Sequence, residues 1–545
     1  MNNRFLLYAA YGLVVFMIWQ QWTIENSPVR STVQSEETIS SELNEANDAD
    51  IPEAGISKAK KERKVSGNNA KKGQFFKISN SSVELTVSSI GGDIVESRLL
   101  NFREKAEIGS NPVSLFTQKR ENYIAQSGLI HEKVDDNKQV AGLAPNHHDD
   151  FKLLKLADRY VELIWQDKSK KINVLKKITL REDDFVADIS YQISNNSSKD
   201  WVGRAYNQLR RSKPTEGRSW ITPSFFGAAY YEGDSYKKVS FDEISDTQMA
   251  EQISGGWVAM MQHYFVSAWA GKEGENSLFY TKEIKGKNGT EYSIGMRSEP
   301  IFIEPEQTAT FSRTLFVGPK LQKNLEKVSP GLELTVDYGM LTFLSKPLFW
   351  LLDKIYSFTA NWGWSIILLT ILIKALFYKL SETSYRSMAK MKKFTPKIQT
   401  LRERYADDRQ KLNQAMLEMY KQEKINPLGG CWPILIQIPV FIALYWVLLE
   451  SVEMRHAPFI LWIDDLSSKD PFYVLPLLMG VSMYIQQKLN PTPPDPVQAK
   501  VMQFLPIIFT AFFAFFPSGL VLYWVVNNIL SIAQQWKIVR TIEGK

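Results

Sequence analysis

A series of apolar segments in the C-terminal half constrains the fold of this chain more than any other feature of its sequence. About 20 apolar residues in a helix cover the hydrocarbon core of a bilayer. Residues 1–22 form a further apolar segment, interpreted as an uncleaved signal anchor because no small-residue cleavage site follows it. The C-terminal candidates are 362–379, 433–449, 472–488, 502–516 and 519–535. The sequence therefore predicts a multi-domain chain, built on a polytopic α-helical membrane protein with six spans.

The charges of the connecting loops predict the topology. Residues 381–430 contain eleven Lys and Arg against six Asp and Glu, whereas residues 450–471 contain two against five. Basic loops stay in the cytoplasm, so we expect the first loop inside the cell and the second outside. Both termini are then cytoplasmic, in agreement with the basic C-terminal tail at 537–545. We expect a multi-pass membrane protein with the region after the first span outside the cytoplasm. In a Gram-negative-type cell this means the bacterial inner membrane, with that region in the periplasm.

The region after the first span consists of three segments that differ in composition. Residues 23–74 contain no aromatic residue and run from acidic to basic, which predicts a disordered linker. Residues 75–337 alternate apolar and polar side chains between Gly and Asn turns, which predicts a large periplasmic domain folded as an antiparallel β-sandwich. Residues 338–356 are apolar but interrupted by charges, and we expect an interfacial amphipathic helix there.

The basic loop at 381–430 has a periodicity of its own. Apolar residues recur at three- and four-residue steps on both sides of Asp407 and Asp408, which predicts a cytoplasmic hairpin of two antiparallel amphipathic helices. One interpretation is a solvated hairpin held near anionic lipid. The other is a docking surface for nascent chains, since methionine side chains adapt to many partners. The candidate docking residues are Met388, Met391, Met416 and Met419.

Lys374 lies inside the predicted span at 362–379. An ammonium group surrounded by hydrocarbon costs about 3 kcal/mol on insertion scales. One interpretation is that Lys374 snorkels its charge to the headgroups, close to Lys379. The other is that it faces a polar site inside the protein. Thr370 precedes it by four residues and therefore shares its helix face.

Two longer motifs indicate a family. Residues 426–445 read Asn-Pro-Leu-Gly-Gly-Cys-Trp-Pro-Ile-Leu-Ile-Gln-Ile-Pro-Val-Phe-Ile-Ala-Leu-Tyr, and residues 516–524 read Phe-Pro-Ser-Gly-Leu-Val-Leu-Tyr-Trp. The first resembles the third-span signature of the YidC family of membrane protein insertases, and the second resembles its last hairpin. The likeness covers roughly 340–540, and the added anchor and β-domain resemble the Gram-negative form. It implies a five-span insertase core at 357–536.

The resemblance also implies a mechanism. In this family the five spans enclose a polar groove that is open to the cytoplasm and to lipid. The family has an arginine where this chain has Lys374, so the positive charge is kept while the planar fork of donors is lost. The other residues expected in the substrate groove are Thr370, Gln437, Tyr523, Trp524 and Asn528, with Asn527 as a further candidate.

The rest of the sequence argues against other classes of function. A single cysteine, Cys431, excludes an intramolecular disulfide and a cysteine metal cluster, and the His and Asp run at 147–150 is interpreted as a solvated loop. There is no phosphate-binding loop, and the net charge of +6 is small for this length. We therefore expect no enzyme activity, cofactor, metal or nucleic-acid binding. The alternative is a secondary transporter or channel, although the spans show no internal repeat.

The expected partners follow from the resemblance and from the charges. They are nascent membrane proteins, membrane lipids and components of the Sec translocon. Ribosome binding is expected to be weak, because residues 536–545 carry only three basic side chains beside Glu543.

Overall fold

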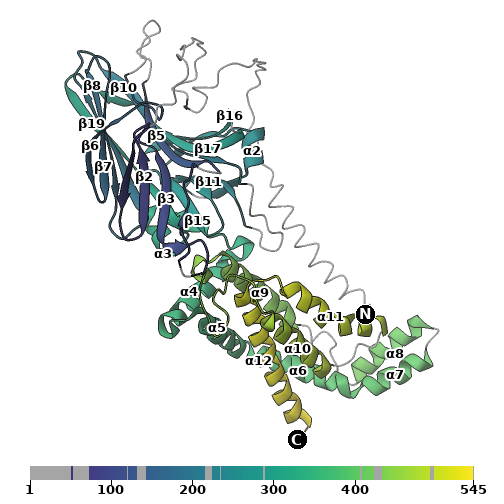
Figure 1. Ribbon diagram of the computed structural model, residues 1–545. Helices are drawn as coiled ribbons and strands as arrows, with labels where there is room; N and C mark the ends of the chain where they lie inside the picture. Colours follow the sequence, from purple (N-terminus) through teal and green to yellow (C-terminus); the bar gives the residue numbers. More distant parts are fainter. Residues whose placement is uncertain are drawn as a thin grey trace.

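The computed structural model describes most of the chain, as a β-domain followed by a helical domain (Figure 1). The predicted anchor at 1–22 and most of the predicted linker at 23–74 lie outside the described residues. These are 51–52, 73–107, 109–118, 121–131, 143–214, 224–233, 235–286, 289–405, 408–422, 432–490 and 496–543.

The β-domain consists of two antiparallel sheets. The first has the order β1-β2-β3-β5-β10-β17-β16-β13, with β4 paired to β3 and β18 paired to β10. Its strands are β1 (Phe75–Ser79), β2 (Val83–Ser88), β3 (Ile94–Arg103), β4 (Pro112–Ser114), β5 (Tyr123–His131), β10 (Trp201–Ser212), β13 (Ala250–Ser254), β16 (Asn276–Gly286), β17 (Gly289–Ser298) and β18 (Ile301–Ile303).

The second sheet has the order β12-β11-β14-β15-β19-β9-β8-β7-β6. Its strands are β6 (Lys152–Ala157), β7 (Tyr160–Gln166), β8 (Ile172–Leu180), β9 (Val186–Asn195), β11 (Gly227–Tyr231), β12 (Tyr236–Val239), β14 (Trp257–Met261), β15 (Phe265–Ala270) and β19 (Gln307–Pro319). Helix α2 (Phe241–Asp246) follows β12. The predicted alternation is visible in β8, where every second residue is buried.

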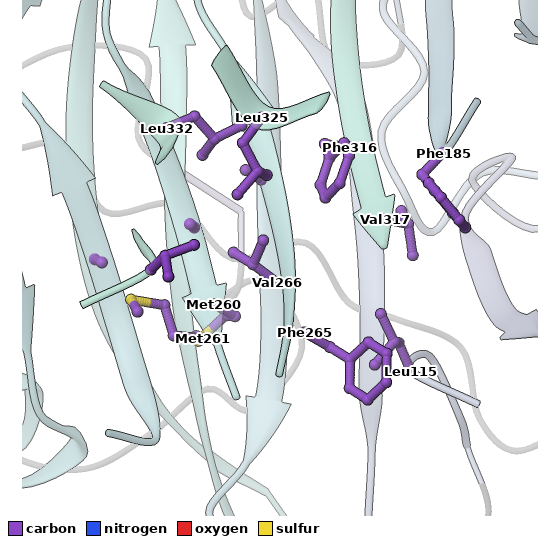
Figure 2. Close-up of a cluster of buried hydrophobic side chains, with 14 of the residues drawn as sticks. Leu115, Phe185, Met260, Met261, Phe265, Val266, Phe316, Val317, Leu325 and Leu332 are labelled. Carbon is purple, nitrogen blue, oxygen red and sulfur yellow. The ribbon is translucent and has the colours of Figure 1, made fainter. Parts of the chain in front are cut away.

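The core of the β-domain continues into the segments that lead to the helical domain. Strands β14 and β15 are buried on both faces. Figure 2 shows Leu325 of α3 (Gln322–Val328) and Leu332 of η1 (Leu332–Thr335) in the same apolar cluster as Met260 and Val266 of these strands. The connection is therefore part of the folded core.

The helical domain contains the predicted apolar segments as packed helices. Helix α4 contacts α5 and α9, and α12 contacts α5, α6 and α10 (Figure 1). The elements are η2 (Gly339–Leu341), α4 (Thr342–Thr359), α5 (Trp362–Leu376), α6 (Tyr378–Lys393), α7 (Thr395–Arg404), α8 (Arg409–Gln422), α9 (Trp432–Glu450), η3 (Val452–Met454), α10 (Val474–Leu489), α11 (Pro496–Phe513) and α12 (Ser518–Glu543).

Helix length does not confirm the six-span prediction. Within the described residues, no single helix has both the length and the apolar composition to cross a bilayer alone. Helix α5 and the first part of α6 meet that requirement only as a pair, with a bend of 67° between them. The helices nevertheless coincide with the predicted apolar segments.

Two predicted helices differ from the structure. The amphipathic helix expected at 338–356 is α4, which begins at Thr342 after the short turn η2. The first helix of the predicted hairpin is divided at Phe394 into α6 and α7. Pro396 stands in the first turn of α7, and a proline is tolerated there because its missing N–H would lack an intrahelical partner.

The run at 147–150 is not simply a solvated loop. His147 is buried, and its backbone N–H donates to the Tyr206 hydroxyl at 3.1 Å. Nearby, Lys176 takes an inward position of β8, and its Nζ donates to the carbonyl oxygen of Gly91 at 2.8 Å. Burial lowers the pKa of Lys176 to about 8, opposed by the charge of Asp93. The β-domain therefore encloses a polar cluster.

The two domains meet at a second set of ionisable side chains, which we call the junction cluster: Lys238, His263, Lys320 and Glu450. Lys320 is 2% exposed. Burial raises the pKa of Glu450, and the charges of Lys320 and Lys238 oppose that shift. The Nε2–H of His263 donates to the carbonyl oxygen of Leu449 at 3.0 Å, at the end of α9 where such carbonyls lack intrahelical partners. The β-domain therefore caps α9.

Candidate functional site

The helical domain contains a partly open cleft with a volume of about 290 Å³. It lies between α9, α10, α11 and α12, and none of the described residues that line it is charged. The polar lining consists of amides and two aromatic residues with polar groups. The lining residues are Gln437, Ile438, Phe441, Met483, Gln486, Gln487, Asn490, Met502, Leu505, Pro506, Tyr523, Trp524, Asn527 and Asn528.

Helix periodicity explains the contribution of α12. Tyr523 and Asn527 are four residues apart, as are Trp524 and Asn528, so the four side chains form two adjacent rows on one face. The rows face α9, where Gln437 Nε2 donates to Asn527 Oδ1 at 2.7 Å and Gln437 also hydrogen-bonds the Tyr523 hydroxyl. Asn528 instead bonds α10, through Nδ2 to Ser482 Oγ at 3.0 Å. Gln437, Asn527 and Asn528 therefore each have a side-chain partner within the described helices.

An aromatic wall forms the other part of the lining. Phe441 stacks on Tyr523 with ring centroids 5.9 Å apart, and it meets Trp524 edge-on at 4.3 Å. Trp524 also contacts Phe513 of α11 at 5.4 Å. Such contacts hold the rings in fixed orientations, so one wall of the cleft is apolar and rigid while the opposite groups are polar.

Lys374 is next to the cleft and does not line it. Its Nζ donates to Ser531 Oγ at 2.8 Å, and Ser531 Oγ donates to the carbonyl oxygen of Asn527 at 2.7 Å. The cation is thus linked to a lining residue through one hydroxyl group. Thr370 is buried, and its hydroxyl donates to the carbonyl of Ile366 in its own helix at 2.6 Å.

The structure therefore brings together four of the six residues predicted for the groove, namely Gln437, Tyr523, Trp524 and Asn528. Sequence reasoning missed Gln486, Gln487 and Asn490, at the end of α10, and Ser531. The adjacent glutamines after an apolar run were a usable signal for the first two. Ser531 carried no such signal, because serine is common in helix contacts.

The methionines predicted to dock substrates lie on the hairpin. Met419 is buried, and Met388, Met391 and Met416 are half-buried. Figure 1 shows α7 and α8 projecting beyond the helices that enclose the cleft. The docking role of these residues stays a prediction.

Comparison with known proteins gives the same assignment along the whole chain. Residues 354–545 match the family described as "60Kd inner membrane protein", and residues 76–351 match the family described as "YidC periplasmic domain". The chain is 46% identical over 552 residues to the membrane protein insertase YidC of Thioalkalivibrio sulfidiphilus, covering 99% of both chains. It is 44% identical over 554 residues to that of Methylococcus capsulatus, covering 99% of this chain and 98% of the relative.

A solved structure described as an active YidC insertase with its first transmembrane domain resolved is also similar. It is 17% identical, with a TM-score of 0.37, and the match covers 84% of this chain and 91% of that one. The two full-length relatives and the two family matches are sufficient for a conclusion: this chain belongs to the YidC family of membrane protein insertases.

Proposed function

We propose that this protein inserts nascent membrane proteins into the bacterial inner membrane, with the cleft as the path of the hydrophilic segment that crosses. The observation that carries the proposal is the lining of the cleft, where uncharged amide groups face an apolar wall in the middle of apolar helices. A covalent reaction does not require such a lining. A passing polypeptide does, because its backbone and polar side chains lose water on entering the membrane.

The amides of the cleft compensate for part of this loss. Gln437, Gln486 and Asn527 each carry both donor and acceptor atoms, so they accept any peptide group without selecting a sequence. The apolar span of the substrate then leaves sideways into lipid, where burial of about 20 apolar residues drives completion. No nucleotide is needed for this step.

Lys374 adds a long-range electrostatic contribution. A cation one hydroxyl group behind the lining attracts acidic residues of a crossing tail without binding them in the cleft. The attraction therefore changes the rate at which substrates with acidic tails are inserted, while insertion of substrates with neutral tails depends on the amides alone.

The topology and partners are part of the same proposal. The basic loop at 381–430 and the acidic loop at 450–471 support cytoplasmic termini and a periplasmic β-domain. The hairpin α6–α8 then stands in the cytoplasm, where a nascent chain first meets the protein. Work beside the Sec translocon and weak contact with the ribosome belong to this proposal, supported by the family resemblance and the basic tail.

Reconstitution tests the proposal directly. The purified full-length chain is placed in liposomes, and a single-span substrate with a short hydrophilic tail is synthesised in their presence. Protection of the tail from added protease measures insertion. We expect protection well above that of protein-free liposomes and a marked loss with Gln437→Leu, whereas Thr541→Ala, an exposed hydroxyl far along α12, leaves it unchanged. Equal protection with and without the protein contradicts the proposal.

A further inference from the structure

Ser531 stands where three helices meet. It belongs to α12, it accepts a hydrogen bond from Lys374 of α5, and Tyr385 of α6 lies close to it. Ser531 is 3% exposed. The Ser531 hydroxyl donates its hydrogen to the carbonyl oxygen of Asn527. Its oxygen therefore acts only as an acceptor toward the ammonium group of Lys374. Within the described residues, Lys374 has no ion pair.

A second contact from the same face of α12 fixes the bend between α5 and α6. Gln534, one turn after Ser531, donates through Nε2 to the carbonyl oxygen of Tyr378 at 3.2 Å. Tyr378 is the first residue of α6, directly after the helix break at Phe377. The bend of 67° follows Lys374 by three residues, so holding the bend also holds the lysine stem.

We infer that Ser531 is the positioning residue for Lys374, and that it fixes the ammonium group behind Asn527 so that the charge acts on acidic segments in the cleft. The inference rests on the proposed function. A lysine is a point charge on a flexible stem, so its direction has to be imposed by a partner. Ser531 supplies that partner, and Gln534 keeps the two helices in register.

The alternative is that Ser531 only packs α12 against its neighbours. The two accounts differ in their dependence on Lys374 and on substrate charge. A packing role predicts that Ser531→Ala impairs all substrates equally, whether or not Lys374 is present. A positioning role predicts a loss that is confined to acidic tails and that disappears when the lysine is absent.

The experiment is a double-mutant cycle in the reconstituted full-length chain. Insertion is measured for two substrates that differ only in acidic residues on the crossing tail. We expect Ser531→Ala to lower insertion of the acidic-tailed substrate about tenfold, the lower end of the range for one hydrogen bond to a charged group. Insertion of the neutral-tailed substrate should change by less than about twofold. Ser531→Thr should insert the acidic-tailed substrate as well as the unmodified protein does. On a Lys374→Ala background, Ser531→Ala should cause no further loss of insertion.

Thr541→Ala is the matched control, because Thr541 makes the same bond to the carbonyl four residues earlier and has an exposed side chain. Equal losses on both tails, or an unchanged loss on the Lys374→Ala background, would overturn the inference and leave the insertase function intact. Absence of insertion by the unmodified protein would instead contradict the proposed function.

A second measurement does not depend on insertion. Trace labelling with an amine reagent, read by peptide mass spectrometry, compares Lys374 with Lys379, whose side chain is 91% exposed. A hydrogen bond to the charged form protects an amine from labelling. We expect Ser531→Ala to raise the ratio of Lys374 to Lys379 labelling about threefold, with Ser531→Thr near the unmodified value. An unchanged ratio contradicts the positioning role.

Discussion

His263 makes the attachment of the β-domain sensitive to acid. Its side chain is 19% exposed, and burial together with the charges of Lys320 and Arg455 lowers its pKa from 6.5 to about 4. Glu450 lies 3.9 Å away and would favour a charged imidazole, but burial dominates. The hydrogen bond to Leu449 is therefore made by a neutral ring.

The size of the effect follows from the two pKa values. Above pH 6.5 the ring is neutral in both the folded and the unfolded chain, and its contribution to stability is complete. Between pH 6.5 and 4 the unfolded chain binds a proton that the folded chain does not, so the free energy of unfolding falls by about 1.4 kcal/mol per pH unit. Lowering the pH from 7 to 5 should therefore remove about 2 kcal/mol of stability.

The comparison that isolates this residue is His263→Gln, which stays neutral and keeps an N–H donor for Leu449. Equilibrium urea unfolding of the detergent-solubilised chain, followed by tryptophan fluorescence, gives the free energy at pH 7 and pH 5. We expect the unmodified protein to lose about 2 kcal/mol more than the variant over this interval. Equal losses would refute the argument, because the acid sensitivity would then arise from other groups.

Three further predictions concern the helical domain. Lys374→Arg should preserve insertion of a substrate with an acidic tail and Lys374→Glu should reduce it at least about tenfold; equal effects on a neutral tail would remove the electrostatic part of the mechanism. Gln437→Leu should lower insertion of both tails alike, about tenfold, because Asn527 loses its partner at 2.7 Å; an effect limited to acidic tails would contradict this. Gly480→Ala should destabilise the domain by about 1–3 kcal/mol in thermal unfolding, since a Cβ there would collide with Thr510 Oγ1; an unchanged melting temperature would show that α10 and α11 separate freely.

The sequence predicted those parts of the structure that depend on local patterns. The apolar segment expected at 433–449 is α9, and the alternation expected in the β-domain appears in strands such as β8. Four residues predicted for the groove line the cleft. Gln437 and Asn528 were predicted because a polar side chain in an apolar span is costly when it faces lipid, whereas Tyr523 and Trp524 were predicted from the family resemblance. Their role in a substrate path stays a prediction. The positions of apolar segments, and of polar residues within them, can be recognised from hydropathy alone, without information about tertiary contacts.

The remaining features depend on contacts between distant residues. Nothing local distinguishes Ser531 from other helical serines, yet its position opposite Lys374 depends on how α5 and α12 cross. His147 lies in a polar run and is buried only because Tyr206, far along the chain, supplies a partner. The bend after α5 was missed because an apolar run continues across it. The attachment of His263 to α9 likewise depends on tertiary packing.

The continuity of helix α12 has a mechanical consequence for the cleft. It is a continuous helix over Ser518–Glu543, about 39 Å long at 1.5 Å per residue. Its N-terminal half supplies Tyr523 and Trp524 to the cleft, and its C-terminal half reaches Gln535, which bonds Asn490. Because the helix is unbroken, its C-terminal end and both aromatic rings belong to one continuous element, and a load on that end is carried along the axis toward the cleft. A force applied at that end, about 28 Å from Trp524, can thus act on the cleft without any contact inside it.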